Sequence, residues 1–165
     1  MKLLSIDPSS TKTGYAVFDG NEVIDAGLLT GKSGTEYFYR VFKMMLELDD
    51  IFKDHKIDRT VIESPSGHVH GRLKGHARGQ ATYGFAVGAI WAHSRSHVQG
   101  TTLVDANRWT RGIPKKKRQA VIALKYPDYD ADKDTGGDVS DAIGLGEWWL
   151  AEKVYQNVLR AKRSK

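Results

Sequence analysis

The chain contains no cysteine. This excludes disulfide bonds, thiolate metal sites and a cysteine nucleophile. Long apolar runs are also missing. Near the N-terminus, Asp7 interrupts the first hydrophobic stretch after only a few residues. We therefore expect neither a membrane-spanning helix nor a signal peptide.

The residues that are present are those of an ordinary globular domain. Of 165 residues, 40% are hydrophobic and 27% are charged, which is enough for one folded domain over residues 1–165. The formal net charge is +5, and the sequence pI is about 9.3. A basic charge is compatible with a nucleic-acid partner but does not establish one.

Hydrophobic periodicity predicts one mixed sheet covered by helices. The predicted strands are 2–7, 14–19, 22–30, 59–63 and 101–104, and helices are predicted from residue 35, over 77–97, over 114–126 and over 138–163. The inner face of the first helix should carry Phe38, Val41, Phe42, Met45, Leu48 and Phe52. This order indicates an α/β fold with a mixed five-stranded sheet and helices on both faces.

Two acidic residues end strands that we expect to be neighbours. Asp7 closes the first strand and Glu63 closes the fourth. If these strands are adjacent and parallel, both carboxylates emerge at the sheet edge where open α/β proteins build their sites. Each acid alone could equally mark the point where its strand enters solvent.

The last predicted helix begins with two further acids. Asp138 and Asp141 share a helical face with Leu145 and Trp148, so this face should point inward. A capping box formed by Thr135 and Asp138 would explain Asp138, but it would not explain Asp141. Burying unpaired carboxylates is costly, and a divalent cation removes that cost.

Four converging carboxylates predict a hard oxygen site, which favours Mg²⁺ over softer metals, with Mn²⁺ as a substitute. Two ions in such a site suit phosphodiester hydrolysis without an organic cofactor. We expect the four acids to repel one another without metal, so that Asp141→Asn should stabilise the metal-free protein.

Several motifs together resemble those of RuvC-type Holliday junction resolvases, also called crossover junction endodeoxyribonucleases, in particular their phage-borne members. The first strand with Asp7 and Gly14, the Val-Ile-Glu triplet ending at Glu63, and the Asp-x-x-Asp-Ala motif from Asp138 follow the family order. The segment Ala77–Gly79 and the basic segment Trp109–Arg118 also match in place.

The resemblance implies a ribonuclease H-like fold, a homodimer, two Mg²⁺ ions per active site, and paired symmetric nicks in four-way branched DNA. It implies that Asp7, Glu63, Asp138 and Asp141 bind the metal and that Lys116 or Lys117 lies near the reacting phosphate. It also places the protein in the cytoplasm of a bacterial or phage-infected bacterial cell. The chain departs from the family in having no aromatic residue between Glu63 and Gly79.

Basic side chains near these motifs are candidate DNA contacts. They are Arg72, Lys74, Arg78, Arg111, Lys115, Lys116, Lys117 and Arg118. The first three could simply belong to a solvated loop. Positive charges at the start of a helix oppose its dipole, so for Lys115–Arg118 an external anion is the better explanation.

The helix predicted over 77–97 is rich in small residues such as Gly84 and Gly88. These residues allow close approach either to the chain's own sheet or to a second copy in a dimer. We assign Trp109, Trp148 and Trp149 to the core or an interface rather than to DNA stacking. Alternative functions are a less selective nuclease for flaps, forks or RNA–DNA hybrids, and a junction-binding protein without catalysis. An actin-like ATPase would need a second domain.

Overall fold

The computed structural model describes residues 1–31, 36–65 and 77–163. The strands are β1 (Lys2–Asp7), β2 (Lys12–Asp19), β3 (Glu22–Thr30), β4 (Arg59–Ser64) and β5 (Thr101–Asp105). The helices are α1 (Tyr37–His55), α2 (Ala77–His97), α3 (Ala106–Thr110), α4 (Lys115–Lys125) and α5 (Asp138–Arg163). No helix among the described residues is both long and apolar enough to cross a membrane.

All five strands form one mixed sheet in the order β3-β2-β1-β4-β5. The first three strands make an antiparallel meander, with Gly20 at positive φ in the tight turn between β2 and β3. The helical crossover α1 then brings β4 parallel to β1, and β5 continues the parallel half. The predicted mixed five-stranded sheet is therefore confirmed.

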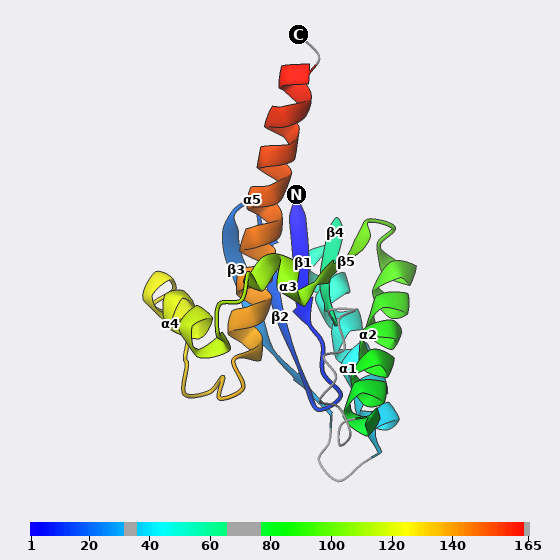
Figure 1. The fold of residues 1–165 in the computed structure, drawn as a ribbon. Coiled ribbons are helices and arrows are strands. Elements are labelled where there is room, and N and C mark those ends of the chain that lie inside the picture. Colours follow the sequence, from blue (N-terminus) through cyan, green and yellow to red (C-terminus); the bar gives the residue numbers. More distant parts are fainter. Residues whose placement is uncertain (32–35, 66–76, 164–165) are drawn as a thin grey trace.

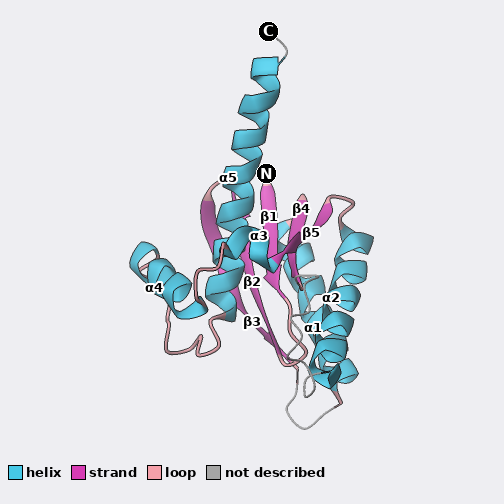
Figure 2. Ribbon diagram, in the orientation of Figure 1, coloured by secondary structure: helices cyan, strands magenta, loops and turns pink. Residues whose placement is uncertain are grey.

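Helices cover both faces of this sheet (Figures 1 and 2). On one face α1 and α2 pack over alternate strand residues such as Leu4 and Ile6. On the other face α3 and the first half of α5 pack over Leu3, Phe18 and Val61, and α4 packs against α5. Because both faces are covered, β1 is buried along nearly its whole length. Figure 1 shows α5 continuing well past the edge of the sheet.

The inner face of α1 differs in part from the prediction. The buried residues of this helix are Val41, Met44, Leu48, Ile51 and Phe52. Phe38 and Phe42 are exposed, at 43% and 54%, so assigning them to the core was wrong. The buried residues form a narrow stripe along the helix, and the two phenylalanines lie at helical angles outside this stripe.

Candidate active site

Asp7 and Glu63 lie side by side at the ends of the two central strands. Ile6 pairs with Ile62 across the parallel β1–β4 ladder, so the next residue on each strand is an acid. Asp7 is buried, with 7% of its surface exposed, and Glu63 is partly buried. The predicted adjacency of these strands is confirmed, and both acids lie at the carboxyl edge of the parallel pair.

The start of α5 brings Asp138 and Asp141 to the same edge. Ser5 on β1 donates a 2.6 Å hydrogen bond to the Ala142 carbonyl, which fixes the helix on the sheet. Gly14, which pairs with Asp7, faces the α5 backbone so closely that a Cβ there would lie 2.0 Å from the Asp138 carbonyl oxygen. Glycine at this position therefore permits the approach that places the α5 acids beside Asp7.

The cap of α5 differs from the predicted capping box. Buried Asp134 accepts hydrogen bonds from the backbone N–H groups of Asp138 and Ser140, at 2.9 and 3.0 Å. Tyr129 donates a further hydrogen bond to Asp134. Asp134 therefore makes the cap hydrogen bonds that the alternative capping box had given to Thr135. Because Asp134 satisfies the helix start, the Asp138 and Asp141 side chains are free to face the site.

Two basic side chains of α4 reach into the group of acids. The Lys115 ammonium lies 2.7 Å from Asp138, 3.2 Å from Asp141 and 3.5 Å from Asp7. Arg118 makes a bidentate pair with Asp141, at 2.9 and 2.7 Å. The carboxylates therefore surround positive charge, and among the described residues their oxygens do not form a group within 4.8 Å of one another.

Trp109 on α3 connects the two halves of the site. Its indole N–H donates a 2.7 Å hydrogen bond to Glu63, while the Arg118 guanidinium lies 4.9 Å from its ring centroid. Tyr83 on α2 makes a longer contact with the other Glu63 oxygen, at 3.5 Å. The sequence placed Trp109 in the core, where it is indeed buried, but gave no sign that its N–H orients an acid.

Burial and mutual repulsion raise the pKa of both strand acids. The pKa of Asp7 is well above its ordinary value because the side chain is buried and lies near Glu63, Asp141 and Asp138, although Lys115 opposes this. Burial also raises the pKa of Glu63, and the Trp109 hydrogen bond partly offsets it. For Lys115, burial lowers the pKa, but the surrounding carboxylates outweigh burial and the net shift is upward.

The residues predicted to contact DNA differ in how far they are exposed. Lys116, Lys117, Arg111 and Arg78 are exposed, whereas Lys115 and Arg118 are partly buried against the acids. Arg72 and Lys74, together with the loop that lacks an aromatic residue, lie outside the described residues. Of the α4 cluster, Lys115 and Arg118 thus reach the carboxylates directly, whereas Lys116 and Lys117 are exposed.

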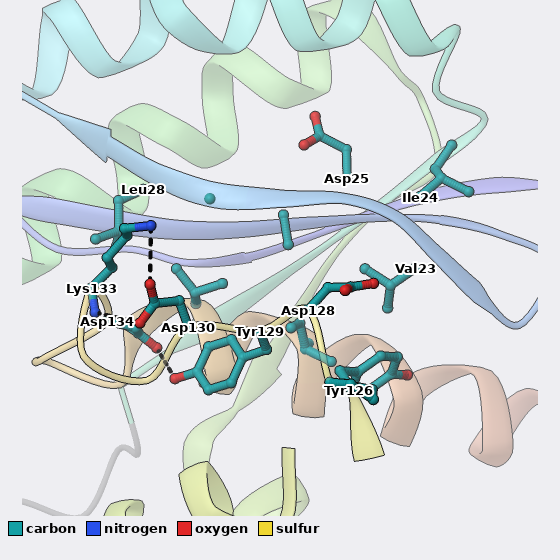
Figure 3. A pocket seen from close by; sticks show the side chains of 15 residues that line it. Val23, Ile24, Asp25, Leu28, Tyr126, Asp128, Tyr129, Asp130, Lys133 and Asp134 are labelled. Carbon is teal, nitrogen blue, oxygen red and sulfur yellow. Dashed lines mark hydrogen bonds and ion pairs between the residues drawn. The ribbon is translucent and has the colours of Figure 1, made fainter. Parts of the chain in front are cut away.

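A separate cavity of about 630 Å³ lies between β3 and the segment that joins α4 to α5. It is lined by Tyr126, Tyr129 and Asp134, among others, and by none of the four acids of the site. Figure 3 shows Asp25 on the opposite side of β3 from these tyrosines. The wall side chains are engaged with one another through the Tyr129–Asp134 and Lys133–Asp130 contacts, so the cavity offers no comparable chemical centre.

Comparison with known proteins gives a partial sequence match. Over 67 residues the chain is 42% identical to the crossover junction endodeoxyribonuclease RuvC of Campylobacter curvus, covering 38% of this chain and 42% of that protein. RuvC of Campylobacter hominis is 41% identical over 68 residues. The chain thus aligns with less than half the length of these relatives. No family model matches the chain.

Solved structures match over nearly the whole chain. The structure of Thermus thermophilus RuvC in complex with a Holliday junction substrate has a TM-score of 0.67 and 12% identity, covering 93% of this chain and 96% of that one. The yeast mitochondrial Holliday junction resolvase Ydc2 has a TM-score of 0.55 and 14% identity, with coverage of 96% and 85%. The RNase H-like fold and the resemblance to RuvC-type resolvases predicted from the motifs are therefore confirmed.

Proposed function

We propose that the chain is a metal-dependent endonuclease that resolves Holliday junctions by paired symmetric nicks. The observation that carries this proposal is the convergence of Asp7, Glu63, Asp138 and Asp141 at one edge of the sheet. The convergence occurs on a fold shared with RuvC, which is itself recorded in complex with a Holliday junction substrate. The sequence match to RuvC proteins supports the same assignment.

The donor set of the site fits divalent metal ions. All four acids offer carboxylate oxygens, and the charge that lies among three of them is the Lys115 ammonium. This position therefore favours positive charge, and hard oxygen ligands favour Mg²⁺, with Mn²⁺ as a substitute. We propose two Mg²⁺ ions held by the four acids. Bound there, they would supply an activated water and stabilise the leaving oxygen.

The protein's own groups orient the acids for this role. Trp109 holds one oxygen of Glu63, and Arg118 holds both oxygens of Asp141. Such partners of ligating side chains fix their orientation and tune their affinity for the ion. In the metal-free protein the single charge of Lys115 offsets part of the charge of Asp7, Asp138 and Asp141, and Lys115 would become available for a phosphate oxygen once cations replaced it.

We propose that the exposed basic residues bind the DNA backbone. Lys116 and Lys117 begin the same helix as Lys115 and are exposed, so they are positioned to meet a phosphate next to the site. Arg78 and Arg111 are exposed as well, and Arg72 and Lys74 remain predictions from sequence. Removing one contacting lysine should lower the slope of log affinity against log salt by about 0.9.

Two alternatives differ from this proposal in ways that can be measured. A less selective nuclease would cut flaps, forks or RNA–DNA hybrids as fast as junctions. A binding protein without catalysis would bind junctions and leave them intact. Since the proposed reaction acts on DNA, we expect the protein in the cytoplasm of a bacterial or phage-infected bacterial cell, and as a homodimer.

The test is Mg²⁺-dependent cleavage of a labelled four-way junction, beside linear duplex, flap, fork and hybrid substrates. The variants Asp7→Asn, Glu63→Gln and Asp141→Asn should each abolish nicking while junction binding in gel shifts stays near wild type, because basic residues supply the affinity. Asp50→Asn, which changes an exposed acid on α1, is the matched control and should cut normally. Near wild-type nicking by any of the three site variants would refute the assignment.

A further inference from the structure

Three metal-ligating side chains converge on the helical layer formed by α1 and α2. The Nε2 atoms of His93 and His97 on α2 each lie 2.9 Å from Oδ1 of Asp49 on α1. In the part of the chain that the structure describes, these are the histidine and acidic side chains whose ligand atoms all lie within 4.8 Å of one another. The two histidines are four residues apart, so they occupy the same helical face.

The contacts within this cluster leave one of the two histidines unsatisfied. Nε2 of His93 is buried and makes no hydrogen bond, even though it lies 2.9 Å from Asp49. The distance would allow a hydrogen bond, so the mutual orientation of the two groups is what prevents it. A buried polar atom without a partner is costly, and a cation shared by the three ligand atoms would remove this cost.

The surroundings hold the rings in place and leave a route to solvent. His97 stacks on Phe52 with centroids 4.5 Å apart and planes within 3°, and His93 meets His97 edge-on at 4.9 Å. Asp49 and His97 line a surface cavity of about 340 Å³, which gives an ion access. Lys53 and Lys56 line the same cavity, and their positive charge repels any cation, so a bound ion must gain its affinity from the imidazole and carboxylate ligands.

We propose that Asp49, His93 and His97 bind a transition-metal ion, with Zn²⁺ as the preferred ion and solvent as its fourth ligand. Two imidazoles and one carboxylate are a donor set typical of zinc, and neutral imidazole is a poor ligand for Mg²⁺. Ligand atoms around tetrahedral zinc are roughly 3.3 Å apart, so each histidine–Asp49 distance needs to increase by only a few tenths of an ångström.

This site is separate from the carboxylate site. Tyr83, which contacts Glu63, precedes His93 on α2 by a stretch that spans roughly 15 Å of helix. Metal at the cluster would join α1 to α2 away from the proposed nuclease centre. Its role is therefore to hold together the two helices that cover this face of the sheet, whatever reaction the other site performs.

The test is titration of the full chain with Zn²⁺, after chelator treatment and in excess Mg²⁺ to occupy the carboxylate site. Calorimetry should give one equivalent of bound Zn²⁺, and the melting temperature should rise with it because a ligand stabilises the state that binds it. Co²⁺ in place of Zn²⁺ should give the intense visible absorption of a tetrahedral site. Asp49→Asn, His93→Asn and His97→Asn should each weaken Zn²⁺ binding at least roughly tenfold.

The matched control is His55→Asn. His55 lies on α1 and contacts Asp25 at 3.0 Å, a histidine–carboxylate pair that has no second histidine. This variant should bind Zn²⁺ like wild type. If His93→Asn fails to fold, His97→Asn decides the question, because the His97 side chain is 36% exposed. Absence of Zn²⁺ binding by the wild type, or wild-type affinity in Asp49→Asn and His97→Asn, would overturn the proposal.

Discussion

The four acids of the site differ in their charged partners and in their burial, although they look alike in the sequence. Asp141 forms a bidentate pair with Arg118, and Asp138 is closest to the Lys115 ammonium. Asp7 is the most deeply enclosed of the two strand acids, and Lys115 reaches it only at 3.5 Å. Changing each acid to its amide should therefore affect the metal-free protein in different directions.

Asp7→Asn should stabilise the metal-free protein at neutral pH. Because the pKa of Asp7 is raised in the folded state, the folded protein holds a proton there more tightly than the unfolded chain does. The ionised carboxylate therefore costs stability above its raised pKa, and this cost fades as the pH falls toward the unfolded value of about 4.

The measurement for Asp7 is urea unfolding of wild type and variant in chelator, across this pH range. The gain in unfolding free energy should increase as the pH rises from about 4 through the raised pKa. A variant that is less stable than wild type at neutral pH would contradict this prediction and show that Lys115 more than compensates for the buried charge.

Asp141→Asn should have the opposite effect and destabilise the metal-free protein by about 1–3 kcal/mol. The substitution breaks a largely buried, bidentate pair and leaves the Arg118 guanidinium without its charged partner. This reverses the sign expected from the sequence, where the basic residues of α4 were assigned to DNA and the acids were expected to repel one another. Thermal melting in chelator, with Asp50→Asn as the exposed control, distinguishes the two signs.

The short helix α3 positions a side chain of the active site, although it has only five residues. Asp105 caps it by accepting a hydrogen bond from the Asn107 N–H at 2.8 Å, and it carries Trp109 between Glu63 and Arg118. Trp109→Phe keeps an aromatic ring in the core but removes the N–H donor. We expect the Mg²⁺ concentration needed for half-maximal cleavage to rise roughly 10–100-fold.

Trp148→Phe is the control for this prediction. Trp148 is partly buried on α5 and lies near Arg108, away from the four acids. It should show an unchanged Mg²⁺ requirement on the same junction substrate. Equal Mg²⁺ dependence of Trp109→Phe and wild type would mean that the indole N–H does not orient the metal ligand.

Regular elements were predictable because their periodicity is local. The strand Lys2–Asp7 and the helices Ala77–His97 and Asp138–Arg163 begin and end where the pattern placed them. The helix α3 escaped prediction because five residues cannot display a helical period. The roles of Asp134, Trp109 and Arg118 depend on contacts between residues far apart in the chain, which a single sequence does not reveal.

For the whole molecule, the outward face of α2 is where we expect a second copy to bind. Between residues 81 and 92 its exposed residues are small or aromatic: Ala81, Gly84, Phe85, Gly88, Trp91 and Ala92. Phe85 and Trp91 are 43% and 38% exposed. Small residues at helical spacing allow two helices to approach closely, and a two-fold pair matches the symmetry of a four-way junction.

Gly88→Arg should separate the proposed dimer without harming the fold. A Cβ at Gly88 meets no atom within 4 Å, and replacing a mid-helix glycine favours the helix, so the protomer should melt no lower than wild type. A charged side chain on the outward face of α2 would prevent close contact between the two copies. Sedimentation should therefore show a dimer for wild type and a monomer for the variant, and the variant should make single nicks in junctions rather than paired ones. Wild type that sediments as a monomer, both free and on junction DNA, would contradict the dimer and favour the less selective nuclease.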